Sequence, residues 1–226
     1  MELPEDDFEV YDLEDSESQI SGVIDRFNSG DRVIDLGAGR GRIALPLAKH
    51  GVKVRAVDRD GVALSHRGWS DHANLEIIRE DFLAPQASWF EAGGFHGVAC
   101  LGNTLNLIHD PDQLKGLFLR AADALAPGGM LLIDDFPIWG PEMIRTQWPL
   151  GMSPDEQQQV AWASDGLSFA YRTGSEVDSQ RRYPEPGERL LRAWTLPELE
   201  KIAGQTDFGA WSHDESALMI VFARSD

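Results

Sequence analysis

The sequence predicts an α/β fold in which a doubly wound, mostly parallel sheet of seven strands carries an antiparallel β insertion before the last helix. Three observations predict this fold. Apolar runs typical of buried strands alternate with helical patterns over the first 135 residues, which is the pattern of a parallel sheet. Residues 33–48, VIDLGAGRGRIALPLA, give a strand, a glycine turn and a helix in succession. Acidic residues lie at the ends of the first three predicted strands, at the edge where such sheets bind ligands.

Composition and charge limit the classes of function. The 226 residues fit one domain, 1–226, and a hydrophobic content of 42% is typical of a globular protein. No apolar run reaches the ~20 residues of a membrane span, and the acidic N-terminus has no apolar signal core, so we expect a cytoplasmic protein without a membrane partner. The net charge of −18 would repel a phosphate backbone, which argues against a nucleic-acid partner. A cationic or neutral small molecule is easier to accommodate, and the acidity fits a role in solubility or a salty habitat equally well.

The cysteine and histidine content predicts no metal site. Cys100 is the one cysteine and lies in an apolar run, where it reads as a small buried hydrophobe and not as a nucleophile. The six histidines show no metal-ligand spacing, so we expect no metal.

Residues 1–30 form an N-terminal segment with two parts. Residues 1–15 are rich in Asp and Glu, interrupted by apolar residues, and fit either a solvated tail or a lid that closes over a ligand. Residues 16–27 place Ile20, Val23, Ile24 and Phe27 on one face of a predicted helix.

The glycine turn is the central motif of residues 31–135. Gly37, Gly39 and Gly41 permit positive φ angles and let a ligand lie against the main chain. The helix that follows offers unpaired N–H groups at its N-terminus. A nucleotide-like ligand is therefore expected here.

The next two strands, residues 52–57 and 75–78, each lead into an acid. Asp58 follows the first glycine by 58 − 37 = 21 residues, where a carboxylate can accept hydrogen bonds from both hydroxyls of a ribose, in a nicotinamide nucleotide or in another nucleoside. Asp81 and Phe82 follow the third strand; Asp81 alone would also fit a helix cap.

Two further strands complete the parallel part of the sheet. Residues 97–101 are apolar throughout, as in a strand covered on both faces, and lead into GNTLNLIHD at 102–110. Residues 112–125 have helical spacing, Pro127-Gly128-Gly129 end that helix, and residues 130–133 start the fifth strand.

Three of these stretches carry a family resemblance that spans about residues 33–133. The D-x-G-x-G-x-G pattern of Asp35 to Gly41 resembles the first motif of the class I, Rossmann-like S-adenosylmethionine-dependent methyltransferases. The segment Cys100 to Thr104 resembles the C-L-G-N-[ST] segment of small-molecule methyltransferases, and L-x-P-G-G-x-L-L-I, ending at Ile133, is a further signature of the family. The resemblance implies S-adenosylmethionine as cofactor and a small-molecule methyl acceptor, methylated on oxygen or nitrogen.

The resemblance also implies which residues bind the cofactor. The glycine turn would wrap its methionine half, Asp58 its ribose, and Asp81 with Phe82 its adenine. The full expected set is Tyr11, Asp35, Gly37, Ala38, Gly39, Arg42, Asp58, Arg59, Asp81, Phe82, Leu101, Gly102 and Asn103.

Residues 136–194 depart from the minimal pattern of the family. Short runs at 160–162, 167–171 and 190–194, separated by turn residues, predict antiparallel hairpin strands. In this family such an insertion covers the acceptor pocket or forms the surface of a homodimer, and both roles stay open. Residues 195–226 supply a helix that starts with a capping box, Thr195 with Glu198, and the last strands, around 210–212 and 217–223.

His109 and Asn106 are the candidate catalytic residues. A histidine near the end of the fourth strand has the pKa class of a general base, although a surface histidine at a helix start is an equal alternative. Asp134 and Asp135 are weaker candidates for the base, and Trp139 either stacks on the acceptor or fills the core.

Two other functions fit parts of the sequence. Arg40 and Arg42, beside the glycine turn, could hold the pyrophosphate of a nicotinamide cofactor in an oxidoreductase. A non-catalytic cofactor-binding protein of the same fold would keep the acids Asp35, Asp58 and Asp81 and lack turnover.

Overall fold

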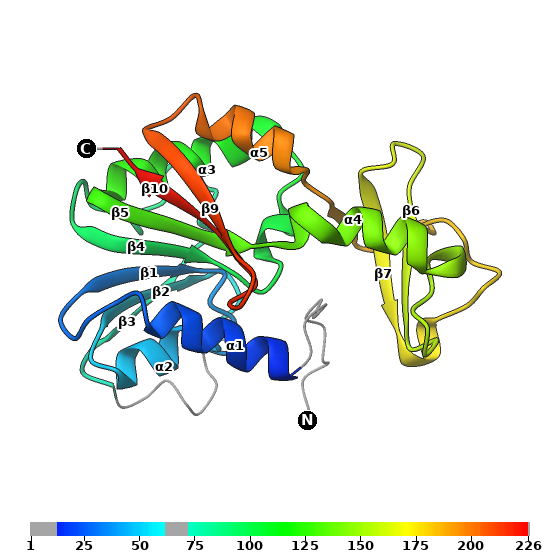
Figure 1. Ribbon diagram of the computed structural model, residues 1–226, viewed down its shortest axis with the longest axis horizontal. Coiled ribbons are helices and arrows are strands. Elements are labelled where there is room, and N and C mark those ends of the chain that lie inside the picture. Colours follow the sequence, from blue (N-terminus) through cyan, green and yellow to red (C-terminus); the bar gives the residue numbers. More distant parts are fainter. Residues whose placement is uncertain (1–12, 62–71, 226) are drawn as a thin grey trace.

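The computed structural model describes residues 13–61 and 72–225 and contains a central seven-stranded sheet (Figure 1). The strand order is β3-β2-β1-β4-β5-β10-β9. The strands are β1 (Arg32–Leu36), β2 (Lys53–Asp58), β3 (Leu75–Arg79), β4 (Phe95–Cys100), β5 (Leu125–Asp134), β9 (Phe208–Asp214) and β10 (Met219–Arg224). Strands β1 to β5 pair in parallel and β10 pairs antiparallel to both neighbours, so the predicted doubly wound, mostly parallel sheet is confirmed.

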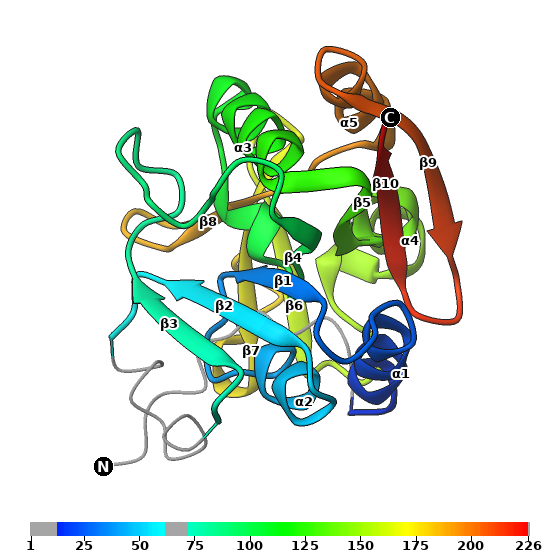
Figure 2. The same cartoon turned by 90° about the vertical axis from the view of Figure 1, so that its left-hand side faces the viewer.

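Helices cover both faces of this sheet. The helices α1 (Leu13–Ile24) and α2 (Ala44–Lys49) lie on one face, and α3 (Pro111–Ala124) and α5 (Leu196–Ala203) lie on the other (Figures 1 and 2). Each face has its own apolar core, with Val23, Phe27 and Leu47 on the first and Leu117, Phe118 and Leu199 on the second. No helix of the described residues is long and apolar enough to span a membrane.

Sequence patterns explain where these elements end. Asp110 caps α3 by accepting a hydrogen bond from the N–H of Asp112 at 2.9 Å. Thr195 and Glu198 form the predicted capping box of α5. The predicted start of the fifth strand at residue 130 was wrong, because β5 pairs with Phe95 of β4 from Leu125 onward and continues through the Pro127-Gly128-Gly129 segment with a register shift.

The insertion projects beyond the end of the main sheet at which β5 leads into the next helix (Figure 1). It contains the helix α4 (Phe136–Gln147), the 3-10 helices η3 (Pro149–Gly151) and η4 (Gly174–Glu176), and a three-stranded antiparallel sheet of β6 (Gln158–Trp162), β7 (Ser168–Thr173) and β8 (Leu190–Arg192). Helix α4 was missed from the sequence. Its apolar side packs on the small sheet, where Phe136, Ile144, Phe169 and Leu191 make a third apolar core.

Candidate functional site

The carboxyl ends of five neighbouring parallel strands carry the candidate site. In the order of the sheet, Asp81 follows β3, Asp58 ends β2, Asp35 lies near the end of β1, Gly102 follows β4, and Asp134 ends β5. Neighbouring strands lie about 4.8 Å apart, so the ends of β2 and β5, three spacings apart, are about 14 Å from each other. A ligand that touches the whole row must therefore be elongated.

The glycine turn lies at the centre of this row. Gly37 has a φ of +72°, and a Cβ built on it would lie 2.5 Å from Cγ2 of Thr104, so the position accepts glycine alone. The N–H groups of Gly37 and Ala38 donate to the carbonyl of Val57, at 2.9 and 3.2 Å, which ties the turn to β2. The turn is thus a rigid backbone surface directly beside Thr104.

Asp58, at the end of β2, is hydrogen-bonded to the glycine turn. Its Oδ2 accepts the N–H of Gly39 at 2.9 Å and its Oδ1 accepts the N–H of Asp60 at 2.8 Å. Each carboxylate oxygen has a second lone pair, so Asp58 retains acceptor capacity.

A cavity of about 80 Å³ opens on this side of the turn. It is lined by Gly37, Asp58, Arg59, Asp81, Phe82, Leu83, Thr104 and Leu107. Five of these residues belong to the set that the resemblance implied: Gly37, Asp58, Arg59, Asp81 and Phe82. No helix follows Asp81; its Oδ1 accepts the N–H of Leu83 at 2.9 Å and so shapes the loop that forms the cavity wall.

A buried polar cluster lies on the other side of the turn. The carboxylate of Asp134 accepts the N–H groups of Gly102 at 3.0 Å and Asn103 at 2.8 Å, which fixes the loop after β4. Gln19 of α1 donates to the same carboxylate at 3.1 Å and accepts a hydrogen bond from Nη2 of Arg42 at 2.7 Å. Leu101, also in the expected set, is buried beside them.

Burial dominates the electrostatics of this cluster. The pKa of Asp35 is raised to about 7, because the desolvation of its buried carboxylate outweighs the attraction of Arg42. The pKa of Asp134 is also raised by burial, against the opposing effects of Arg42 and the hydrogen bonds from Asn103, Gln19 and Gly102. Oδ2 of Asp35 and Nη1 of Arg42 are buried without a hydrogen-bond partner in the described part of the chain. The cluster therefore contains one buried carboxyl oxygen and one buried guanidinium nitrogen whose hydrogen-bonding capacity is unused among the described residues.

The two candidate catalytic residues lie at different depths. Asn106 belongs to the 3-10 helix η2 (Thr104–Leu107) and is buried, with its Nδ2 unpaired in the described structure. His109 is exposed, and its Nε2 lies 2.9 Å from the carbonyl of Leu190 in β8. Arg192 donates to the carbonyl of His109 at 2.8 Å, and Trp194 donates to that of Ile108 at 3.0 Å. The segment that contains His109 thus connects the carboxyl ends of the parallel strands to the insertion.

Sequence reasoning missed two parts of this region. Gln19 is a polar residue on a helix face that otherwise reads as apolar, and this exception was the only signal for it. His213 of β9 lies with its Nε2 3.0 Å from Oδ2 of buried Asp135, whose Oδ1 accepts the indole N–H of Trp139 at 2.7 Å. No pattern in the sequence links residue 213 to residue 135.

Tyr11, the remaining expected cofactor residue, lies outside the described residues, as does most of the acidic N-terminal segment. Among the described residues, no group of three or more His, Cys, Asp or Glu side chains is arranged to hold a metal ion.

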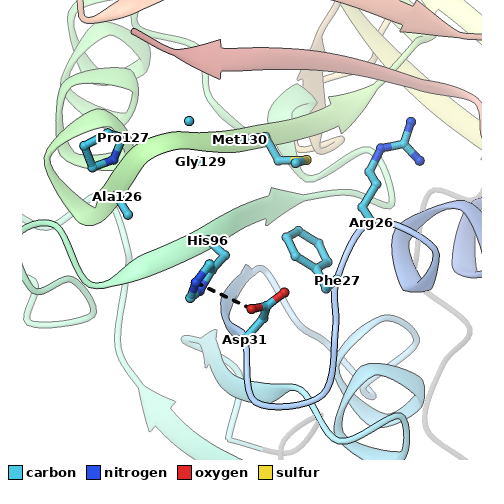
Figure 3. A pocket seen from close by; sticks show the side chains of 9 residues that line it. Arg26, Phe27, Asp31, His96, Ala126, Pro127, Gly129 and Met130 are labelled. Atoms are coloured by element: carbon cyan, nitrogen blue, oxygen red, sulfur yellow. Dashed lines mark ion pairs between the residues drawn. The ribbon is translucent and has the colours of Figure 1, made fainter. Parts of the chain in front are cut away.

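A larger cavity, of about 140 Å³, lies at the opposite edge of the sheet (Figure 3). Its lining comes from the amino-terminal ends of the strands: Asp31 before β1, His96 in β4 and residues 126–130 at the start of β5, with Arg26 and Phe27 after α1. Ligands of such sheets bind at the carboxyl ends of the strands, and the glycine turn is there too. The smaller cavity is therefore the candidate site.

Comparison with known proteins agrees with this geometry. Residues 33–129 match the sequence model of a family described as "Methyltransferase domain". A putative methyltransferase of Geobacillus sp. (strain WCH70) is 26% identical over 149 residues, a match that covers 65% of this chain and 58% of that protein. The match thus spans little more than half the length of that relative.

Two solved structures show the same fold along nearly the whole chain. A S-adenosylmethionine-dependent methyltransferase of Clostridium acetobutylicum ATCC 824 superposes with a TM-score of 0.62 at 19% identity, covering 96% of this chain and 93% of that chain. A S-adenosylmethionine-bound amino pentose methyltransferase of Micromonospora echinaspora gives a TM-score of 0.63 at 16% identity, covering 93% and 92%. The family match at residues 33–129 includes the glycine turn and the ends of the strands on both sides of it. The fold is that of these two enzymes. Residues 33–129 therefore match a methyltransferase domain, and the chain has the class I methyltransferase fold.

Proposed function

We propose that this chain transfers the methyl group of S-adenosylmethionine to a nitrogen or oxygen atom of a small molecule. The observation that carries the proposal is the row of carboxylates across the glycine turn. Asp58, Asp35 and Asp134 lie at the ends of β2, β1 and β5, and Arg42 is the cation that acts on the two buried ones. Such a site suits an elongated ligand that carries positive charge at one end.

The cavity beside β2 and β3 would take the adenosine. Asp58 has the spare acceptor capacity for the ribose hydroxyls, and Asp81 can accept a hydrogen bond from the exocyclic amine of adenine. Phe82, half-buried in the cavity wall, would cover the base. The acids and the apolar wall thus fit a nucleoside without a nearby phosphate.

The buried cluster beside β4 and β5 would take the amino-acid end. Arg42 alone does not balance the two buried carboxylates of Asp35 and Asp134. A cationic ammonium group next to them would supply the second positive charge. The pyrophosphate of a nicotinamide nucleotide would instead bring negative charge toward the same carboxylates. The cluster therefore favours the sulfonium cofactor over the dinucleotide.

When bound, S-adenosylmethionine supplies a methyl group that its sulfonium has already activated. The protein then has to align the acceptor with that methyl group and exclude water. Asn106 could orient the acceptor through its unpaired buried Nδ2. The insertion, joined to the sheet edge at His109, would cover the acceptor.

His109 is our candidate for the group that takes a proton from the acceptor. Its Nε2 lies 2.9 Å from a carbonyl oxygen, which only accepts, so in the neutral ring Nε2 carries the hydrogen and Nδ1 is the basic nitrogen. The contact with Leu190 would thus set the tautomer of His109.

A small-molecule acceptor is supported by charge and by one relative. The net charge of −18 opposes nucleic acid, and the similar protein of Micromonospora echinaspora is named an amino pentose methyltransferase. For this chain we propose a small acceptor that bears an amine or a hydroxyl group.

Calorimetric titration with S-adenosylhomocysteine, the demethylated product, tests the cofactor assignment, with NADH as the competing ligand. We expect micromolar binding of the former, weakened about tenfold by Asp58→Asn, because a ribose hydroxyl would lose a charged hydrogen-bond acceptor. Asp123→Asn, an exposed acid on α3, is the matched control and should bind as the wild type does. Binding of NADH alone would overturn the proposal.

A further inference from the structure

Helix α1 contributes one polar side chain to the interior of the site. Gln19 is 1% exposed, whereas Glu17, two residues earlier on the same helix, is exposed. Its amide nitrogen donates to Oδ1 of Asp134 at 3.1 Å and to the carbonyl of Leu218 at 3.3 Å. Its amide oxygen accepts from Nη2 of Arg42 at 2.7 Å. Gln19 therefore joins an anion to a cation and is itself uncharged.

A primary amide is suited to this position because it has both a donor and an acceptor end. A carboxylate in its place could accept from Arg42 but would repel Asp134. A methyl thioether could fill the same space but would satisfy neither partner. Both charged neighbours are at least partly buried, so the loss of a hydrogen bond here would leave a desolvated polar group unpaired.

The contact with Asp134 supports the loop that follows β4. The carboxylate of Asp134 holds the N–H groups of Gly102 and Asn103 while it accepts from Gln19. Arg42 lies directly against the same loop, since Nη2 would be 3.2 Å from a Cβ on Gly102. Gln19 thus fixes both the cation and the loop at the β4 and β5 end of the site.

We propose that Gln19 is a positioning residue for the amino-acid end of the cofactor: it holds Arg42 and Asp134 in the arrangement that this end of the ligand requires. The proposal rests on the proposed function. The cavity that we assign to the adenosine end adjoins the ends of β2 and β3, and Gln19 is not among the residues that line it.

Two ligands allow the two ends of the site to be tested separately. S-adenosylhomocysteine carries the amino-acid chain, and 5′-methylthioadenosine has the same nucleoside without the amine and the carboxylate. In calorimetric titrations we expect Gln19→Met to weaken S-adenosylhomocysteine about tenfold and to leave 5′-methylthioadenosine within about twofold of the wild type. Gln19→Glu, which keeps the contact with Arg42 and repels Asp134, should show the same selective loss.

Glu17→Gln is the control on the exposed side of α1 and should change neither affinity. A general loss of structure would lower both affinities together, so equal losses for the two ligands would overturn the proposal, as would two unchanged affinities. If the wild type binds neither ligand, the proposed function itself fails. If the wild type binds both ligands and the variants show no selective loss, only the proposed role of Gln19 is contradicted.

Discussion

At the scale of single residues, the buried carboxyl of Asp35 should lower the stability of the free protein at neutral and higher pH. Burial raises its pKa from 3.8 to about 7, so between these values the folded chain holds a proton that the unfolded chain releases. Stability therefore falls as the pH rises through this range, and the full cost, on the order of 4 kcal/mol, is present above about pH 7. Asp35→Asn should stabilise the free protein more at pH 8 than at pH 5 in urea unfolding. An equal change at both pH values would contradict the raised pKa.

The same carboxyl should make cofactor binding depend on pH. A cationic amine beside Asp35 requires the ionised carboxylate, and the charged groups that act on this carboxyl are Arg42 and Asp58. We expect the affinity for S-adenosylhomocysteine to fall as the pH drops from 8 to 6. In Asp35→Asn the affinity should be lower at pH 8 and nearly flat over this range. The pH dependence of 5′-methylthioadenosine, which has no amine, serves as the reference. A wild-type affinity independent of pH would refute this prediction.

Gly37 is constrained by both conformation and contact. At a φ of +72° an alanine is strained, and its Cβ would collide with Thr104. Gly37→Ala should displace η2 and lower the affinity for S-adenosylhomocysteine by more than tenfold, because Thr104 and Leu107 also line the cavity. Gly30→Ala isolates the strain, since Gly30 has a φ of +94° with nothing near its Cβ position. It should lower thermal stability and leave binding unchanged. Equal binding losses in the two variants would mean that strain alone explains the effect.

Among the elements, the insertion depends on a buried cation. Arg172 of β7 is 2% exposed and binds both carboxylate oxygens of Glu188, at 2.7 and 2.9 Å, and the carbonyl of Tyr183. It thereby attaches the loop of residues 174–189 to the small sheet. Arg172→Met should leave Glu188 only its contacts with Arg181 and the N–H of Glu185 and expose this loop to limited proteolysis. Arg182→Met, at an exposed position of the same loop, should not. Resistance of the Arg172 variant equal to that of the wild type would show that the small sheet holds the loop without this cation.

The same pair predicts how the insertion responds to acid. The hydrogen bond from Arg172 lowers the pKa of Glu188 from 4.5 to about 2. Its stabilisation is fully present above about pH 4.5 and is lost as the pH falls toward 2. In hydrogen exchange, we therefore expect residues 177–189 to lose protection between pH 4.5 and 3 in the wild type. The change should be smaller in Arg172→Met, where Arg181 and the N–H of Glu185 still lower the pKa of Glu188.

Elements with regular patterns could be predicted from sequence, and those that depend on tertiary packing could not. The alternation of strands and helices, the glycine turn and the capping box at Thr195 are local signals, so they gave the main sheet and α5. Helix α4 contains Pro137, Gly140 and Pro141, which are poor helix formers, and it is held by the apolar core of the insertion. The grouping of Asp35, Asp58 and Asp81 at the candidate site was predictable because the carboxyl ends of parallel strands meet at one edge. Gln19 and His213 come from outside those strands, so only the folded chain shows their contacts.

At the scale of the whole molecule, the two ends of the parallel strands each carry a cavity, and a ligand could bind at either one. The larger cavity is at the amino-terminal edge, between Arg26 and Met130, and is lined in part by an ion pair of His96 and Asp31 at 3.5 Å. The smaller cavity adjoins the glycine turn and the buried cluster. If size alone selected the site, the ligand would bind at the edge that lacks the turn.

Hydrogen exchange with and without S-adenosylhomocysteine distinguishes the two edges in one experiment. We expect slower exchange on ligand addition at residues 35–42, 58–60, 79–83 and 101–107, because the ligand would cover the strand ends and immobilise the loops between them. Residues 26–31 and 126–130, around the larger cavity, should exchange as before. Protection of the second set without the first would place the ligand at the amino-terminal edge and contradict the proposed cofactor site. Protection of the first set that extends to residues 13–24 would further link α1 to the bound ligand, as the contacts of Gln19 require.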